Sequence, residues 1–437
     1  MSGTTGGGRR VRLFVRSLVV AVSAAVLAVS AFAWIQVRQL DRSTASASVI
    51  QTPVAAPPTA EQNILLLGVD SRTDPQGNPL PPQLLDALHA GDTGDGGDTA
   101  DSITVVHIPA GGGRATAISI PRDSYVRLAD GYGQHKINSA YSRAAAYTTD
   151  SLTTTSTGGA ATSPFAPESG PSASPDDPSV RRAALEAGAR LTVESVEALT
   201  GLPITHYASV NLAGFADVSQ ALGGVPVCLR APVDDPYSGL RLPAGPQEVS
   251  GAEALAFVRQ RHGLPGGDLD RITRQQTFLA SATRQLLSAG TLANPFALDR
   301  LSGVLGRSVT LDDRWDVLSF AGQLQGISAG AVTFRTIPTG DPYLQTASDG
   351  TAVEVDPTQV RQFVDDSIAV DAGKRLPTPE PIGWSDAARA HAAEVGDDSS
   401  GSGTDDPTTS ASTTTVQAAA PAPVTPPITA AAPGCIN

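Results

Sequence analysis

Arginines at two places in the sequence are suited to binding an anion. Arg122 follows Pro121, at the end of an apolar run where the chain leaves a strand and enters a loop. Arg259 and Arg261 stand directly before Gly263–Gly267, a segment that ends a helix. On a continuous helix, residues two apart point about 200° away from each other, so both serve one site only if the helix ends there. A planar guanidinium binds phosphate through two parallel hydrogen bonds, so these positions favour a phosphate ligand; each taken alone is equally typical of a solvated loop or helix end.

A third group of donors lies at the start of a predicted helix. Arg271, Arg274 and Gln275 are three and four residues apart, so they share one helix face. Asp268 precedes them near the expected helix start, where backbone N–H groups also favour an anion. The group predicts an anion site, and its alternative is an ordinary amphipathic helix with its polar face in water.

Carboxylates at two strand ends are candidate ligands of a divalent cation. Asp70 closes a buried apolar run, and Asp101 begins the next one. Mg²⁺ (or Mn²⁺) prefers carboxylate oxygens and is normally shared with phosphate oxygens. Asp74, Asp95 and Asp98 are alternative ligands, because Asp and Gly also dominate ordinary turns.

The elements that must position these residues alternate along the chain. Apolar runs bounded by Gly, Pro and polar residues predict strands at 63–70, 102–108, 115–120, 206–210, 225–229 and 332–337. Helical periodicity predicts helices at 180–199, 212–222, 252–258, 269–287 and 315–325. Strands that alternate with helices favour an α/β sandwich, in which ligands bind at the ends of strands.

The N-terminus carries a segment that is long enough to span a bilayer. Arginines at positions 9, 10, 12 and 16 precede a charge-free stretch at 17–37. The basic residues are expected to keep 1–16 in the cytoplasm, with the rest of the chain outside the cell membrane. A cleaved signal peptide, with Ala31–Ala33 as its cleavage site, is the competing interpretation and predicts the same location. Residues 38–60, rich in Ser, Thr, Ala and Pro, are expected to form a tether.

One folded domain over residues 61–377 is expected, followed by a disordered low-complexity tail at 378–437. A Ser/Thr/Ala/Pro-rich stretch at about 144–178 predicts a disordered insertion in this domain. The two cysteines are Cys228, in an apolar strand-like run, and Cys435, near the C-terminus. Outside a reducing cytoplasm they could form an intrachain disulfide; the alternative is a buried thiol and an unpaired terminal one.

The overall charge of the chain limits the classes of ligand that it can bind. The 437-residue chain has a formal net charge of −13 and a pI near 4.8, which argue against a nucleic acid partner. An anionic ligand must therefore meet a local basic site. A soluble enzyme of nucleotide metabolism is disfavoured by the N-terminal segment and by the lack of a Gly-rich phosphate loop.

Eight short motifs between about residues 62 and 287 occur in an order that is typical of one protein family. They are Asn63–Arg72, Ser119–Asp123, Lys136–Asn138, Leu199–Gly201, Gly214–Phe215, Ala221–Val225, Ala254–Arg261 and Asp270–Gln276. Together they resemble the LytR-CpsA-Psr family of cell-wall glycopolymer ligases, in its actinobacterial form. The resemblance implies a three-layer α/β/α sandwich with a central mixed sheet, outside a single N-terminal transmembrane helix.

The resemblance also implies a phosphotransferase and its site. A phospho-glycopolymer would pass from a polyprenyl-pyrophosphate carrier to a sugar hydroxyl of peptidoglycan, with release of polyprenyl phosphate. By motif position, Asp70 and Asp101 would carry Mg²⁺ (or Mn²⁺). Basic and amide side chains would contact or adjoin the pyrophosphate: Arg72, Arg122, Lys136, Arg259, Arg261, Arg271, Arg274 and Gln275.

The chain departs from the family's pattern around Asp101. The family tends to show Arg-Ser-Asp-Thr there, whereas this chain has Thr99-Ala-Asp-Ser102, so one arginine contact is missing. The general base stays open, with Asp70 and Asp123 as candidates. Two other activities fit the same residues: a polyprenyl-pyrophosphate hydrolase, and a non-catalytic wall module that binds the lipid or the glycan.

Overall fold

The computed structural model describes residues 45–50, 60–91, 98–154, 174–175, 177–264, 268–288, 295–313, 315, 331–374, 427–431 and 433–436. The expected anchor at 17–37, most of the expected helix at 315–325 and most of the expected tail lie outside these ranges. Within these ranges, no helix combines the length and the apolar character needed to cross a membrane.

A mixed sheet of eight strands forms the centre of the molecule, in the order β1-β12-β7-β2-β3-β4-β13-β16. Its strands in this order are Ala45–Ala47, Val309–Asp312, His206–Val210, Gln62–Val69, Ala100–Ile108, Ala115–Ile120, Val332–Thr336 and Ile428–Thr429. Three neighbouring pairs are parallel (β1 with β12, β2 with β7 and β4 with β13), and the others are antiparallel. The predicted mixed α/β architecture is confirmed.

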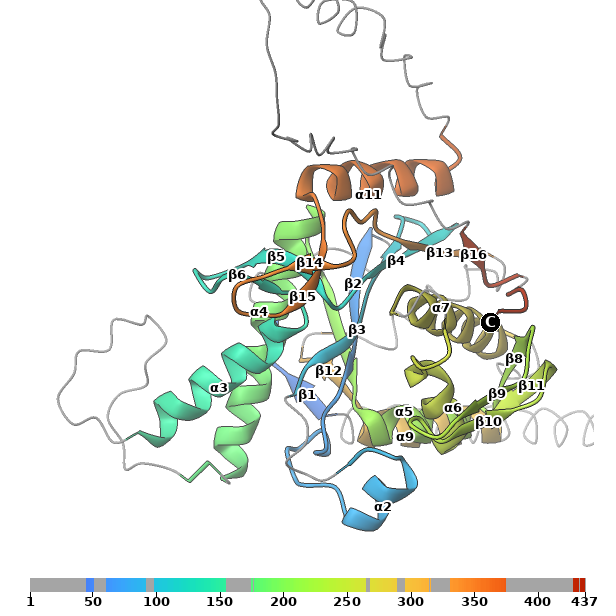
Figure 1. Ribbon diagram of the computed structural model, residues 1–437, viewed down its shortest axis with the longest axis horizontal. Coiled ribbons are helices and arrows are strands. Elements are labelled where there is room, and N and C mark those ends of the chain that lie inside the picture. Colours follow the sequence, from blue (N-terminus) through green and yellow to red (C-terminus); the bar gives the residue numbers. More distant parts are fainter. Residues whose placement is uncertain are drawn as a thin grey trace, which may run out of the picture.

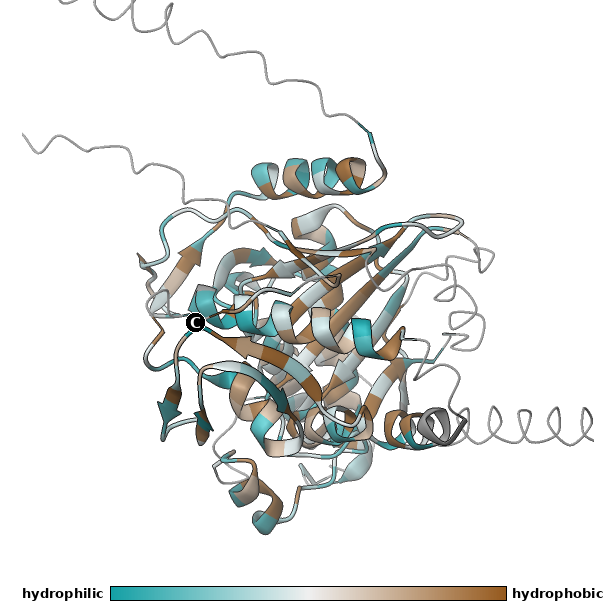
Figure 2. Cartoon of the chain, turned by 90° about the vertical axis from the view of Figure 1, so that its right-hand side faces the viewer, coloured by the Kyte–Doolittle hydropathy of each residue, from teal (hydrophilic) through white to brown (hydrophobic). Residues whose placement is uncertain are grey.

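Helices cover both faces of this sheet (Figure 1). Alternation along β2 sends Leu65 and Leu67 to one face, where they share a core with α3 (Ser139–Thr153), α4 (Pro178–Thr200) and α11 (Pro357–Asp371). Ile64 points to the opposite face, whose core includes Ala280 of α7 (Asp268–Leu286); α5 (Leu212–Ala221) and α9 (Pro295–Ser308) pack together on this side. Figure 2 shows the apolar residues concentrated in the strands and in the helix faces that cover them.

A smaller unit lies beside α7 and holds a second core around Phe257. It contains α2 (Pro82–Ala87), the antiparallel pair β8 and β11 (Val225–Leu229 and Gly245–Val249), the pair β9 and β10 (Val233–Asp235 and Leu240–Leu242), and α6 (Gly251–Arg259). On the other side of the molecule, a four-stranded sheet has the order β14-β15-β5-β6 (Leu344–Gln345, Thr351–Glu354, Ser124–Leu128 and Gly133–Lys136).

Three predicted irregular segments are partly ordered, and these predictions were wrong there. The expected tether contains β1, which pairs with β12, and Val49, two residues beyond this strand, is buried. The expected insertion at 144–178 begins later, because α3 continues to Thr153 and packs Ala144 against the core. The expected tail contains β16, which pairs with β13, and the neighbouring Ala430 is fully buried. Cys228 and Cys435 form a disulfide, which was one of the two alternatives that the sequence left open.

Candidate active site

Three strand ends meet at one edge of the central sheet. β2 ends before Asp70, whose backbone N–H donates to the Thr99 carbonyl at 2.9 Å. β3 runs antiparallel to β2 and begins at this edge, so Asp101 lies beside the end of β2. β4 runs antiparallel to β3 and ends here, which places Arg122 just beyond the sheet. The topology therefore gathers residues that are up to 52 positions apart in the sequence, as the position numbers show.

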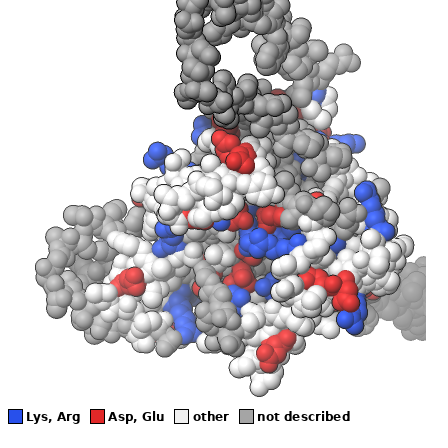
Figure 3. Space-filling model, viewed as in Figure 1, with Lys and Arg blue, Asp and Glu red and all other residues white. Residues whose placement is uncertain are grey.

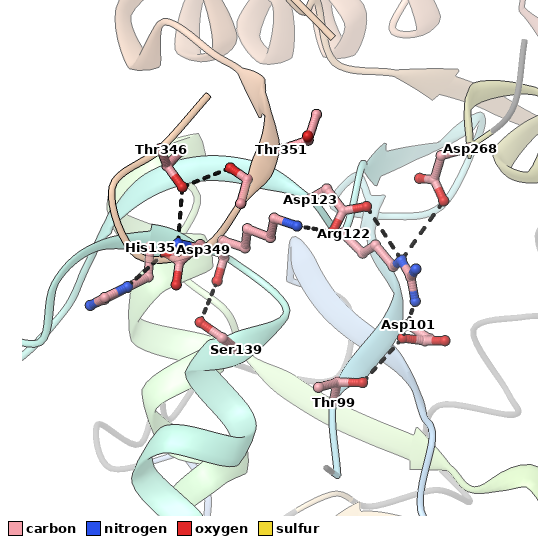
Figure 4. A network of polar contacts seen from close by, with 12 residues as sticks. Thr99, Asp101, Arg122, Asp123, His135, Ser139, Asp268, Thr346, Asp349 and Thr351 are labelled. Carbon is pink, nitrogen blue, oxygen red and sulfur yellow. Dashed lines mark hydrogen bonds and ion pairs between the residues drawn. The ribbon is translucent and has the colours of Figure 1, made fainter. Parts of the chain in front are cut away.

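Arg122 is surrounded by carboxylates (Figure 4). Its Nη1 lies 2.7 Å from Asp101 Oδ1, and its Nε lies 3.6 Å from Asp123 Oδ2 and 3.7 Å from Asp268 Oδ1. Burial alone lowers the pKa of Arg122, but the three carboxylates outweigh burial and raise the pKa above its ordinary value. Arg122 therefore stays charged at this edge.

Asp101 is held ionised by its neighbours. Burial raises the pKa of its carboxyl, whereas the charges of Arg122 and Arg271 and a hydrogen bond from Thr99 lower it, and the net pKa lies below the usual value. An anionic Asp101 orients Arg122, and it is also the form that a metal ion would require.

The first turn of α7 brings more arginines to the same place. Asp268 Oδ1 lies 2.7 Å from Arg271 Nη2 and 3.8 Å from Arg261 Nη2, in addition to its contact with Arg122. Burial lowers the pKa of Arg271 to about 10, and the positive charges of Arg122 and Arg261 add to this effect. The site thus concentrates positive charge that a bound anion would neutralise.

Lys136 completes this group, with its Nζ 3.4 Å from Asp123 Oδ1. We call the following residues the arginine cluster: Arg122, Lys136, Arg261 and Arg271 with the carboxylates Asp101, Asp123 and Asp268. Figure 3 shows basic and acidic side chains gathered in the middle of this face. Four cations surround three carboxylates, so the cluster has an excess of positive charge in a chain that is acidic overall.

A polar network holds the strand that carries Lys136 (Figure 4). His135 Nδ1 lies 2.7 Å from Asp349 Oδ2, and Arg143 Nη2 donates to Asp349 Oδ1 at 3.0 Å. Ser139 accepts a hydrogen bond from Arg143 Nε and donates one to the Lys136 carbonyl. The network therefore fixes β6 against α3 and against the loop before β15.

Arg274 and Arg259, two of the predicted site residues, make their contacts outside the arginine cluster. Arg274 is fully buried, its guanidinium stands 5.1 Å from the centre of the Phe257 ring, and its three nitrogens make no hydrogen bond within the described residues. Burial lowers the pKa of Arg274 to about 10, while Asp270 and Asp235 raise it. Arg259 ends α6 as predicted, and its Nη1 donates to the His89 carbonyl at 3.3 Å.

Arg72 and Gln275 make backbone contacts. Arg72 is buried and donates from Nε and Nη2 to the Ala90 carbonyl, at 3.0 and 2.8 Å. Gln275 Nε2 lies 3.5 Å from the Val258 carbonyl. Arg72 thereby connects the end of β2 to the segment that Arg259 contacts, and Gln275 connects α7 to α6.

The carboxylates around Asp70 fit a divalent cation in their chemistry. Asp70 Oδ1 is buried, accepts no hydrogen bond from the described residues, and lies 3.4 Å from Arg72 Nη1. Burial raises the pKa of nearby Asp98, and the charge of Asp70 raises it further. A hydrogen bond with Ser71 and the charge of Arg72 lower this pKa, but the net pKa lies above its usual value. Asp74 instead caps a turn through the N–H groups of Gln76 and Asn78, while Asp95 lies outside the described residues. Among the described residues, no group of three or more Asp, Glu, His or Cys side chains is arranged to coordinate a metal ion.

Sequence reasoning did not predict the contacts that three residues make at the site. Gln276 Nε2 donates to Ser119 Oγ at 3.0 Å and Thr336 Oγ1 at 2.9 Å, which ties α7 to the ends of β4 and β13. Asp268 was expected only as a residue near a helix start, and Asp123 only as a possible base. The signal for Gln276 was its position in the run of polar residues that opens α7.

Comparisons with known proteins show which family this chain resembles. Residues 35–365 match the LytR_cpsA_psr family. The cell wall biosynthesis protein LcpA of Corynebacterium glutamicum is 40% identical over 378 residues, which cover 84% of this chain and 67% of LcpA. The polyisoprenyl-teichoic acid–peptidoglycan teichoic acid transferase TagU of Enterococcus faecalis is 25% identical over 207 residues, or 46% of this chain and 54% of TagU.

A solved structure supports the fold. The protein gbs0355 of Streptococcus agalactiae superposes with a TM-score of 0.50 at 16% identity, covering 73% of this chain and 90% of that protein. The chain spans about two thirds of the length of LcpA and about half that of TagU. Since the family match covers most of the chain, the protein belongs to the LytR_cpsA_psr family.

Proposed function

We propose that this protein transfers a phospho-glycopolymer from a polyprenyl-pyrophosphate carrier to a sugar hydroxyl of peptidoglycan. The observation that carries the proposal is the arginine cluster, which gathers four cations where three strands of the sheet end. TagU, by its name, carries out a transfer of teichoic acid to peptidoglycan, and LcpA acts in cell wall biosynthesis. Both names are consistent with this reaction class.

The proposed reaction is a displacement at phosphorus. The acceptor hydroxyl oxygen forms a bond to the phosphorus that bears the glycan, and the bond from that phosphorus to the bridging oxygen breaks. Polyprenyl phosphate leaves with the bridging oxygen, and the hydroxyl proton passes to a carboxylate, for which Asp123 and Asp70 are the candidates. Such a transfer depends mainly on positioning and on charge neutralisation. Arg122, Arg261 and Arg271 would supply the charge, with Lys136 beside them.

A divalent cation is part of the proposal. Asp70 and Asp101 would hold Mg²⁺ (or Mn²⁺), with Asp98 as a neighbouring carboxylate, and the buried oxygen of Asp70 supports this assignment. When bound, the ion would neutralise charge on the pyrophosphate.

The location is also proposed. Residues 17–37 would anchor the chain, with 1–16 in the cytoplasm and the catalytic domain outside the membrane, where peptidoglycan is assembled.

The test uses the full chain in detergent with a synthetic polyprenyl-pyrophosphate oligosaccharide and peptidoglycan fragments, with Mg²⁺ or with EDTA. A phosphodiester-linked conjugate that forms only with the metal is expected. Conjugate formation that EDTA leaves unchanged would contradict the metal assignment.

Two alternative functions predict other products. Sugar phosphate released without conjugate would identify a hydrolase, which shares the site and uses water as acceptor. Lipid binding without turnover in either condition would identify a non-catalytic wall module and overturn the proposed transfer.

A further inference from the structure

Two aromatic side chains stack on the surface of the smaller unit. Tyr237 follows β9, and His262 follows α6; their ring centroids are 4.0 Å apart, with planes inclined by 25°. The stack does not bury the tyrosine, which remains 73% exposed. Tyr343 is similarly exposed at 75%, but it has no aromatic partner within the described ranges.

Buried polar groups hold both segments of this pair in place. Asp235 is buried, and it accepts hydrogen bonds from the Tyr237 backbone N–H at 3.1 Å and from Ser238 Oγ at 2.7 Å. Gln260 is also buried and donates from Nε2 to the His262 carbonyl at 3.0 Å. The backbone that carries the stacked pair is therefore held in place, so this platform loses little conformational entropy when a ligand binds.

The platform adjoins the arginine cluster. His262 directly follows Arg261, whose Nη2 lies 3.8 Å from Asp268 Oδ1. The surroundings of the platform are polar, because Arg241 and Asp234 on the two flanking strands pair at 3.2 Å and are 81% and 66% exposed. A polar rim suits a glycan better than it suits a polyprenyl chain.

We propose that Tyr237 and His262 form a sugar subsite for the donor glycan, in the part of it that adjoins the pyrophosphate. This inference rests on the proposed function. A pyranose ring presents weakly positive C–H groups on one face, and an aromatic ring presents a negative face to them. The donor glycan is bonded directly to the pyrophosphate, so its first sugars extend from the arginine cluster over the neighbouring surface.

The experiment measures binding of two lipids by the full chain: bare polyprenyl pyrophosphate and the same carrier bearing a chito-tetrasaccharide. The wild type is expected to bind the sugar-bearing carrier about tenfold more tightly. Tyr237→Ala should abolish this difference and leave binding of the bare carrier unchanged. Tyr237→Phe, which keeps the stack, and Tyr343→Ala, which removes an equally exposed tyrosine, should both retain the difference.

Several outcomes would overturn the subsite. They are equal affinity of the wild type for both carriers, a sugar preference that survives in Tyr237→Ala, and an equal loss in Tyr343→Ala. Weakened binding of soluble muropeptides by Tyr237→Ala, with donor binding intact, would assign the platform to the acceptor instead. Because binding does not require turnover, a sugar preference without transfer would refute the proposed function and leave the subsite standing.

Discussion

Arg122 connects the three carboxylates of the arginine cluster, and its loss should be the most damaging single change. Arg122→Ala would remove a preorganised cation and leave Asp101 without its partner at 2.7 Å. We expect transfer to fall by about 10²–10³-fold, the usual effect of removing one such donor. The measurement is the rate of conjugate formation. Arg182→Ala, which removes an exposed arginine paired with Glu186 on α4, is the control. Transfer within about threefold of wild type in Arg122→Ala would contradict the assignment.

Arg271 and Arg274 lie one helical turn apart, and the structure predicts different roles for them. Arg271 contacts Asp268 in the cluster, whereas Arg274 stacks on Phe257 without a hydrogen bond in the described residues. Arg271→Met should lower transfer by about 10²-fold. Arg274→Met should retain transfer within about threefold and leave the unfolding free energy unchanged or higher, because Met fills similar volume without a desolvated charge. An equal loss of transfer in both variants would contradict this distinction and show that Arg274 also acts in the site.

Sequence spacing identified the residue types of this site but did not separate these two arginines. They are three residues apart in the sequence, so they lie about 60° from one another around the helix. What separates them is packing: Phe257 comes from α6 and Asp268 from the start of α7. Such contacts between distant segments have no local signature, and the same holds for the bonds that Gln276 makes to two strand ends.

At the scale of elements, α4 meets the turn between β5 and β6 through two carboxyl groups. Burial raises the pKa of Glu194 on α4 from its usual 4.5 to about 7, and the neighbouring carboxyl of Asp130 adds to this effect. The folded state therefore prefers protonated Glu194. Its contribution to stability is present below about pH 4.5 and is lost as the pH rises towards 7.

Glu194→Gln should remove this pH dependence. Because Glu194 is only half buried, solvent screening reduces the effect, and we expect the variant to be more stable than wild type by about 1 kcal/mol at pH 8 and equal to it at pH 4. Urea unfolding at both pH values measures the difference. Glu186→Gln, on the same helix but at a carboxylate paired with Arg182, is the matched control and should not be more stable than wild type at pH 8. If the stability of both variants relative to wild type changed with pH in the same way, the role of burial at Glu194 would be refuted.

The elements that the sequence predicted well are those with a strong hydrophobic signal. β2, β3 and β4 are buried runs, and α4 and α7 carry helical periodicity, so their existence followed from local pattern. α3 was missed because its Ala, Ser and Thr residues resemble a linker in composition; only the close packing of α3 on α4 shows why small residues occur there. Gly188 illustrates this contact, since a Cβ at that position would lie 2.6 Å from the Tyr141 carbonyl oxygen.

At the scale of the whole molecule, the C-terminal segment returns to the folded domain. β16 adds an edge strand to the central sheet by pairing with β13. Further along, the Ile436 backbone N–H donates to the Cys228 carbonyl at 2.9 Å, and the Arg230 N–H donates to the Ile436 carbonyl at 2.7 Å. Composition predicted a tail that buries nothing. That prediction failed here because a short run of small and β-branched residues is enough to pair with a free sheet edge.

The disulfide between Cys228 and Cys435 closes a loop of 207 residues, and its removal should destabilise the whole domain. A cross-link over so long a loop restricts the unfolded chain, so we expect the double variant Cys228→Ala/Cys435→Ala to lose about 2–4 kcal/mol of unfolding free energy. Denaturant unfolding with and without reductant measures this. Reductant should bring the wild type to the level of the variant and leave the variant unchanged. Mass spectrometry of unreduced tryptic peptides should show the link. Two free thiols in the purified protein, with equal stability of wild type and variant, would overturn this account of how the C-terminus is held.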